Sequence, residues 1–103
     1  MENLLAGQVA LVTGAGRGLG RAFAERLARL GCHIAVHGMR ENGPAEYGEG
    51  TTLTDTARQI SSQFGVRTIR VLGDLTVGSD VENVVQSTIS ELGPIDILVQ
   101  NAG

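Results

Sequence analysis

Four short apolar runs alternate with three longer segments of helical periodicity, and this order constrains the fold more than any other feature. The apolar runs are Val9–Val12, Ile34–Val36, Thr68–Leu72 and Ile95–Val99. Continuous apolar runs of this length are typical of strands that are covered on both faces. Strands that alternate with helices in this way predict a parallel sheet with helices on both of its sides.

The intervening segments carry apolar residues at helical spacing, and each is followed by a glycine. In the first, from Arg17 to Leu30, these residues are Leu19, Phe23, Leu27 and Leu30. In the second, from Thr52 to Phe64, they are Leu53, Ala57, Ile60 and Phe64. In the third, which ends at Leu92, they are Val81, Val84, Val85, Ile89 and Leu92. Each set predicts one buried helix face.

Local signals refine the helix boundaries. Thr52 with Asp55 resembles a weak capping box before the second helix, and Ser79 with Glu82 predicts a capping box before the third. The segment from Gly38 to Thr51 is rich in glycine and has no apolar periodicity, so it predicts a long surface loop. Loops of this length often carry function.

Between the first strand and the first helix lies a glycine-rich turn, Thr13-Gly14-Ala15-Gly16-Arg17-Gly18-Leu19-Gly20. Unpaired backbone N–H groups at a helix N-terminus bind phosphate, and side chains would block its approach. We expect Gly14 to make the tight turn, Gly18 to let a pyrophosphate come close, and Gly20 to let the helix pack on the strand. The chain contains no lysine, which excludes a P-loop. A purely structural turn is the alternative.

The T-G-x-x-x-G-x-G spacing of this turn resembles that of the short-chain dehydrogenase/reductase family. Two further features agree: Asp74 in Gly73-Asp74-Leu75 after the third strand, and Asn101-Ala102-Gly103 after the fourth. The latter matches the family's N-N-A-G motif, except that Gln100 replaces the first asparagine. The resemblance covers the chain from about Leu5 to Gly103 and implies an α/β fold, a doubly wound Rossmann-type parallel sheet with strand order 3-2-1-4.

The resemblance implies a dinucleotide cofactor, NAD(P)(H). It assigns the cofactor-binding residues as Thr13, Gly14, Gly16, Arg17, Gly18, Leu19, Gly20, Gly38, Arg40, Asp74, Leu75, Asn101, Ala102 and Gly103. An NAD enzyme normally has a carboxylate at the end of the second strand, where this chain has Gly38. With Arg17 and Arg40 as cationic partners for a 2′-phosphate, NADP(H) is favoured. NAD(H) is the alternative, because Glu41 provides a carboxylate shortly after the second strand.

Catalysis in the family uses a serine, a tyrosine and a lysine four residues after the tyrosine, with hydride supplied by the nicotinamide. The only tyrosine here is Tyr47, and the residue four positions later is Thr51. We therefore assign no catalytic residue and expect residues 1–103 to be the N-terminal part of a single Rossmann domain without its catalytic part. The resemblance implies that the complete enzyme acts on an alcohol or ketone, with a 3-oxoacyl compound as the candidate substrate, and forms a homo-oligomer. A non-catalytic binding or regulatory module, paired with a partner through its open sheet edge, is the alternative.

Composition excludes other classes of partner. Eight arginines stand against eleven acidic residues, giving a net charge of −3 without a basic run, so we expect neither nucleic acid nor membrane as a partner. The single cysteine, Cys32, predicts a small buried residue and fits a reducing, cytoplasmic location. His33 and His37 flank the second strand without a third ligand, so we expect no metal site.

Overall fold

The sheet contains four parallel strands in the order β3-β2-β1-β4. The computed structural model describes residues 4–16, 18–41 and 52–101. The strands are β1 (Val9–Val12), β2 (His33–Gly38), β3 (Thr68–Leu72) and β4 (Ile97–Val99). Both the parallel sheet and the strand order 3-2-1-4 expected from the sequence are confirmed.

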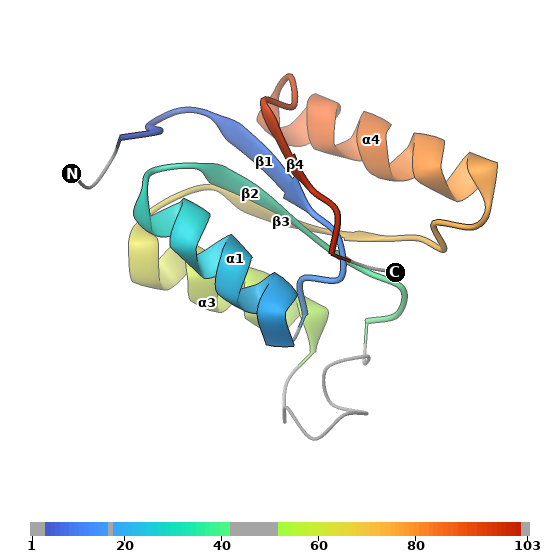
Figure 1. Cartoon of the computed structure of the whole chain (residues 1–103), viewed down its shortest axis with the longest axis horizontal. Coiled ribbons are helices and arrows are strands. Elements are labelled where there is room, and N and C mark those ends of the chain that lie inside the picture. The colour runs from blue at the N-terminus through green and yellow to red at the C-terminus, as the bar shows by residue number, and fades with distance from the viewer. Residues whose placement is uncertain (1–3, 17, 42–51, 102–103) are drawn as a thin grey trace.

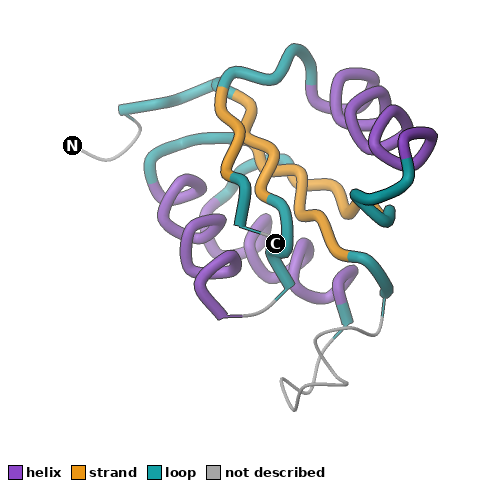
Figure 2. Tube along the Cα trace, turned by 45° about the vertical axis from the view of Figure 1, so that its right-hand side comes forward, coloured by secondary structure: helices purple, strands orange, loops and turns teal. Residues whose placement is uncertain are grey.

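The helices α1 (Gly18–Arg29) and α3 (Leu53–Phe64) cover one face of the sheet, and α4 (Gly78–Leu92) covers the other. Figure 1 shows this three-layer arrangement, and Figure 2 shows the strands side by side between the two helical layers. In the part of the chain that the structure describes, no helix is both long and apolar enough to span a membrane.

Strand β1 lies at the centre of the core because it pairs with both β2 and β4. Its side chains alternate between the two layers: Ala10 and Val12 belong to the cluster under α1 and α3, and Val9 and Leu11 to the cluster under α4. All four residues are buried. This two-sided burial explains why the run is continuously apolar instead of alternating with polar residues.

Helix α3 has the predicted boundaries and buried face. The Thr52 hydroxyl accepts a hydrogen bond from the Asp55 N–H (3.2 Å), and the Thr52 N–H donates to the Asp55 carboxylate (3.5 Å), so the capping box is confirmed. Gly65 ends the helix in the left-handed region, at a φ of 70°, which favours glycine. Leu53, Ala57 and Ile60 are buried.

The predicted buried face of α1 is wrong at its N-terminal half. Leu19 is 64% exposed and Phe23 is 41% exposed, whereas Gly20, Ala24 and Ala28 are buried. These three small residues repeat every fourth position, so they form one stripe along the helix. Small side chains let a helix lie close to the sheet, and a search for large apolar residues overlooks such a stripe.

The predicted capping box of α4 is also wrong. The helix begins at Gly78, its N-cap is Val77, and no side chain caps it there. The Asp80 carboxylate instead accepts a hydrogen bond from the Asp74 N–H, at 2.8 Å. The buried residues of α4 are Val84, Thr88 and Leu92, whereas Val81 and Ile89 are 37% and 40% exposed.

Strand β4 is shorter than predicted because Asp96 joins β1 through its side chain. The Asp96 carboxylate accepts a hydrogen bond from the Val9 N–H, and the Asp96 N–H donates to the Val9 carbonyl, both at 2.9 Å. Asp96 therefore has a structural role at the start of β4. Cys32 is buried, as expected, and burial, followed by the nearby Asp96 carboxylate, raises the pKa of its thiol.

We predict that Ile60→Ala lowers the free energy of unfolding by about 2–5 kcal/mol, because it leaves a cavity between α3 and the sheet. Ile60 is 1% exposed and belongs to the core cluster shared by α1, α3 and the sheet. Urea denaturation measures the loss. Ser62→Ala, on the exposed side of the same helix, should change the value by less than about 0.5 kcal/mol. Equal effects of the two variants would contradict this packing.

Candidate functional site

The carboxyl ends of the four parallel strands meet at one edge of the sheet, and main-chain hydrogen bonds connect them there. The Ala15 N–H donates to the His37 carbonyl (2.8 Å), which joins the turn after β1 to β2. The Gly73 N–H donates to the Gly38 carbonyl (3.2 Å), which joins the ends of β2 and β3. Ligands of open parallel sheets bind at this edge, outside the carboxyl ends of the strands.

The glycine-rich turn leads from β1 directly into α1. Gly14 and Gly18 adopt left-handed conformations, with φ values of 61° and 58°. A Cβ added at Gly18 would meet no atom within 4 Å, so the space beside this residue is open. Leu19 is exposed and Gly16 is buried. The first turn of α1 has no acidic residue, so nothing there offsets the positive end of the helix dipole.

Gly20 makes the closest approach in the site. A Cβ at this position would lie 2.1 Å from the Gly14 carbonyl oxygen and 2.6 Å from Asn101 Nδ2. The predicted need for glycine here is therefore confirmed, although the helix approaches the glycine-rich turn and Asn101 and not the body of a strand. Backbone atoms cannot yield as a flexible side chain can, so this position excludes any side chain.

Thr13 and Asn101 link the ends of β1 and β4. The Thr13 hydroxyl donates to the Val99 carbonyl (3.3 Å) and accepts from the Asn101 N–H (2.9 Å). The Asn101 side-chain amide donates to the Gly14 carbonyl (3.3 Å). Asn101 therefore fixes the glycine-rich turn from the β4 side. Ala102 and Gly103 lie outside the described residues, as does Arg17.

The end of β2 has no carboxylate at the position where NAD enzymes normally carry one. That position is Gly38, whose added Cβ would lie 3.0 Å from a Leu53 methyl carbon of α3. Met39 and Arg40, which follow it, are exposed. The structure thus places Arg40 at the same end of the sheet as the glycine-rich turn.

Glu41 is held by α3 and β3. One carboxylate oxygen accepts a hydrogen bond from the Thr54 N–H (2.7 Å), and the other lies 2.9 Å from Arg70 Nε. Burial acts to raise the pKa of Glu41, but hydrogen bonds from Thr54, the Arg70 charge and a hydrogen bond from Thr52 outweigh it, so the pKa is lowered. Glu41 therefore caps the start of α3 as an ionised carboxylate.

Asp74 lies in the turn that leads from β3 towards α4. Its Oδ1 accepts hydrogen bonds from the Thr76 hydroxyl (2.6 Å) and the Thr76 N–H (2.9 Å). These two bonds lower the pKa of the Asp74 carboxyl. Asp74 and Leu75 are both partly exposed at the edge where the strands end. Asp74 therefore stabilises this turn through its bonds to Thr76.

His37 is the residue that the sequence analysis missed. It lies within β2, is only 2% exposed, and uses both ring nitrogens. The Gly14 N–H donates to its Nδ1 (3.1 Å), and its Nε2 lies 2.9 Å from the Gly73 carbonyl oxygen. The available signal was a second histidine in a strand whose centre is apolar, directly before Gly38. Among the described residues, no group of three or more potential ligands could hold a metal.

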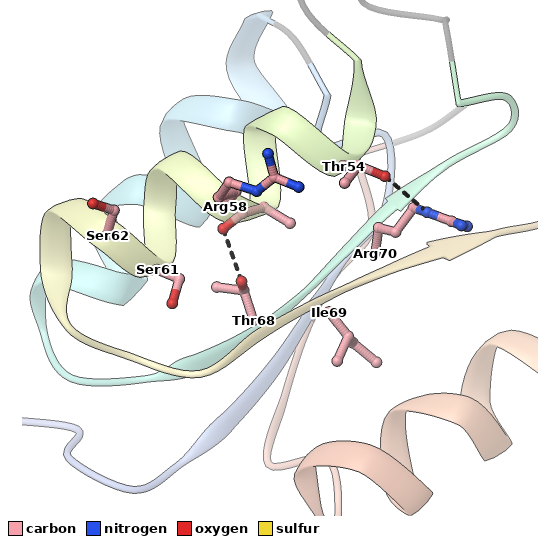
Figure 3. Close-up of a pocket in the computed structure, with 8 residues that line it drawn as sticks. Thr54, Arg58, Ser61, Ser62, Thr68, Ile69 and Arg70 are labelled. Atoms are coloured by element: carbon pink, nitrogen blue, oxygen red, sulfur yellow. Dashed lines mark hydrogen bonds between the residues drawn. The ribbon is translucent and has the colours of Figure 1, made fainter.

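A shallow depression of about 390 Å³ lies away from the glycine-rich turn, between α3 and the edge strand β3. Figure 3 shows its lining, with Arg70 bonded to the Thr54 hydroxyl (3.0 Å) and Thr68 to the Ala57 carbonyl (2.8 Å). Both of its arginines face carboxylates, Arg58 with Asp55 and Arg70 with Glu41. The hydrogen bonds of Arg70 and Thr68 thus attach β3 to α3, whereas the Arg58–Asp55 pair lies within α3.

We predict that Gly20→Ala lowers the free energy of unfolding by about 1–3 kcal/mol or more, because the new methyl group overlaps the Gly14 carbonyl. Thermal unfolding followed by circular dichroism measures the change. Gly78→Ala is the matched control, since a Cβ at the first residue of α4 meets nothing within 4 Å. A Gly20→Ala protein as stable as the control would contradict the close approach of α1.

We predict that Glu41→Gln destabilises the protein at neutral pH and not in acid. Because folding lowers the pKa of Glu41, its stabilising contribution is present above its ordinary pKa of 4.5 and is lost as the pH falls through the lowered value. Urea denaturation at pH values above and below this window measures the difference from the natural protein. Glu82→Gln, at an exposed position of α4, is the control and should match the natural protein throughout.

Comparison with known proteins identifies the family. Residues 8–103 match the model of the short chain dehydrogenase family. The chain is 38% identical over 109 residues to cyclohexanol dehydrogenase of Rhodococcus sp. (strain TK6), covering 99% of this chain and 39% of that protein. It is 37% identical over 97 residues to 3-oxoacyl-[acyl-carrier-protein] reductase FabG of Escherichia coli (strain K12), covering 94% and 34% of the two chains.

The fold comparison agrees. The crystal structure of L-sorbose reductase from Gluconobacter frateurii, complexed with NADPH and L-sorbose, matches with a TM-score of 0.82 and 36% identity. That match covers 100% of this chain and 36% of the reductase. The chain thus spans between a third and two fifths of the length of these relatives. It carries the N-terminal portion of a Rossmann-type oxidoreductase fold and belongs to the short-chain dehydrogenase family.

Proposed function

We propose that these residues form the cofactor-binding part of an NADP(H)-dependent oxidoreductase that interconverts an alcohol and a carbonyl compound. The observation that carries the proposal is the turn through Gly14 and Gly18. This turn leaves the N-terminus of α1 accessible at the carboxyl edge of the sheet. The open space beside Gly18 fits a cofactor phosphate, and the close contact at Gly20 fits the tight packing that such a turn needs.

In this proposal different groups along the sheet edge contact different parts of the cofactor. The pyrophosphate would lie at the glycine-rich turn, held by Thr13, Gly14, Gly16, Arg17, Gly18, Leu19 and Gly20. Gly38 and Arg40 would lie beside the adenosine ribose, and Asp74 and Leu75 beside the adenine. Asn101, Ala102 and Gly103 would border the remaining part of the cofactor. The bound nicotinamide would supply or accept the hydride.

The preference for NADP(H) over NAD(H) rests on charge at the end of β2. Gly38 offers no carboxylate to repel a 2′-phosphate, and Arg40 offers a cation near it. The carboxylate that favoured NAD(H), Glu41, is engaged by the Thr54 N–H and Arg70. The L-sorbose reductase structure, which contains NADPH, is consistent with this preference.

The substrate class follows from the relatives and is proposed only for the whole enzyme. Cyclohexanol dehydrogenase, 3-oxoacyl-[acyl-carrier-protein] reductase and L-sorbose reductase share an alcohol or carbonyl group as the reacting centre. The same proposal includes a 3-oxoacyl compound as the candidate substrate, a cytoplasmic location and a homo-oligomeric enzyme. The similarity to oxidoreductases does not favour a non-catalytic regulatory module.

We predict that Gly18→Asp abolishes dinucleotide binding while Gly18→Asn only weakens it. Both side chains tolerate a left-handed conformation and have nearly the same shape, so the difference between them reports the carboxylate facing the pyrophosphate. Titration calorimetry of the full-length protein with NADPH and with NADH measures both affinities. Tighter NADH than NADPH binding would contradict the cofactor preference, and equal affinities of the Asp and Asn variants would contradict the phosphate site.

A further inference from the structure

His37 connects two segments that the proposed cofactor would contact. Its Nδ1 accepts a hydrogen bond from the Gly14 N–H of the glycine-rich turn (3.1 Å). Its Nε2 lies 2.9 Å from the carbonyl oxygen of Gly73, the residue before Asp74. With 2% exposure, the imidazole is shielded from water, so these two bonds have no solvent substitute.

The two partners fix the protonation state of the ring. The Gly14 N–H can only donate, so Nδ1 must carry a lone pair, and the Gly73 carbonyl can only accept, so Nε2 must carry the hydrogen. An imidazolium would place a donor against the Gly14 N–H and lose that bond. The two hydrogen bonds therefore assign the lone pair to Nδ1 and the hydrogen to Nε2.

The same residue also holds the turn through its main chain. The Ala15 N–H donates to the His37 carbonyl at 2.8 Å, so His37 orients two consecutive peptide groups of the turn. Gly14 is in the left-handed region at a φ of 61°, and its carbonyl oxygen faces Gly20. Once the N–H groups of Gly14 and Ala15 are bonded inward to His37, the course of the turn into α1 is set.

We propose that His37 is a positioning residue for the cofactor, which holds the glycine-rich turn and the Gly73-Asp74 segment after β3 in fixed relation. The proposal rests on the proposed function, because it assigns to His37 the alignment of the pyrophosphate and adenine sides of one dinucleotide site. Preorganised binding groups raise affinity because less order has to be imposed on binding. Loss of the imidazole should therefore weaken cofactor binding more than it weakens folding.

The test compares three variants of the full-length protein by titration calorimetry with NADPH. His37→Leu keeps the apolar bulk but leaves both partners unbonded, and we expect it to weaken binding about tenfold or more. His37→Asn retains an acceptor near the Nδ1 position for the Gly14 N–H, and we expect it to recover most of the affinity. The control is His33→Leu at the other end of β2, where Nδ1 accepts from the Arg67 N–H (3.0 Å), and it should bind as the natural protein does.

Thermal unfolding of each variant separates positioning from general stability. If His37→Leu binds NADPH as tightly as the natural protein, the role of His37 is overturned and the proposed function is not. The same holds if His37→Asn does not recover the affinity that His37→Leu loses. Absence of NADPH and NADH binding by the natural protein would overturn the proposed function as well. Nitrogen NMR of the ring in the natural protein needs no variant: the hydrogen is expected on Nε2 and the lone pair on Nδ1, and the opposite tautomer would overturn the proposal.

Discussion

The pairing of β1 with a parallel strand on each side is the constraint on which the rest of the structure depends. Because β2 and β4 occupy both edges of β1, and helices cover both faces, β1 has room only for apolar side chains. The same pairing brings the ends of β2 and β4 to the glycine-rich turn. Asn101 and His37 then hold that turn from opposite sides, through the Gly14 carbonyl and the Gly14 N–H.

Contacts of the main chain, more than of large side chains, shape the candidate site. The Gly20 Cα lies against the Gly14 carbonyl, the Gly38 carbonyl accepts from Gly73, and the Thr13 N–H donates to the Val99 carbonyl at 3.0 Å. Side chains such as those of Thr13, His37 and Asn101 complete these bonds. Ionised Glu41 and Arg70 stand apart from this network and attach α3 to the edge strand.

Short-range patterns of apolar residues, caps and glycines were sufficient to predict the strands, the α3 capping box and the glycine-rich turn, and the family resemblance supplied the strand order. These patterns were insufficient for α1, where a stripe of Gly20, Ala24 and Ala28 outweighs the larger Leu19 and Phe23. They also missed the early start of α4 and the double hydrogen bonding of His37. The hydrogen bonds of His37 involve partners far apart in the chain, Gly14 and Gly73, whose proximity only the folded sheet creates.

The small-residue stripe of α1 inverts the usual relation between side-chain size and mutational tolerance. In most amphipathic helices the large apolar positions are the sensitive ones, since enlarging or removing them disturbs the core. Along α1 the residues next to the sheet are small and buried, so any substitution at Gly20, and any larger residue at Ala24, adds volume to a packed contact. Homologous sequences should therefore vary little at the small buried residues of α1 and vary more at the exposed Phe23.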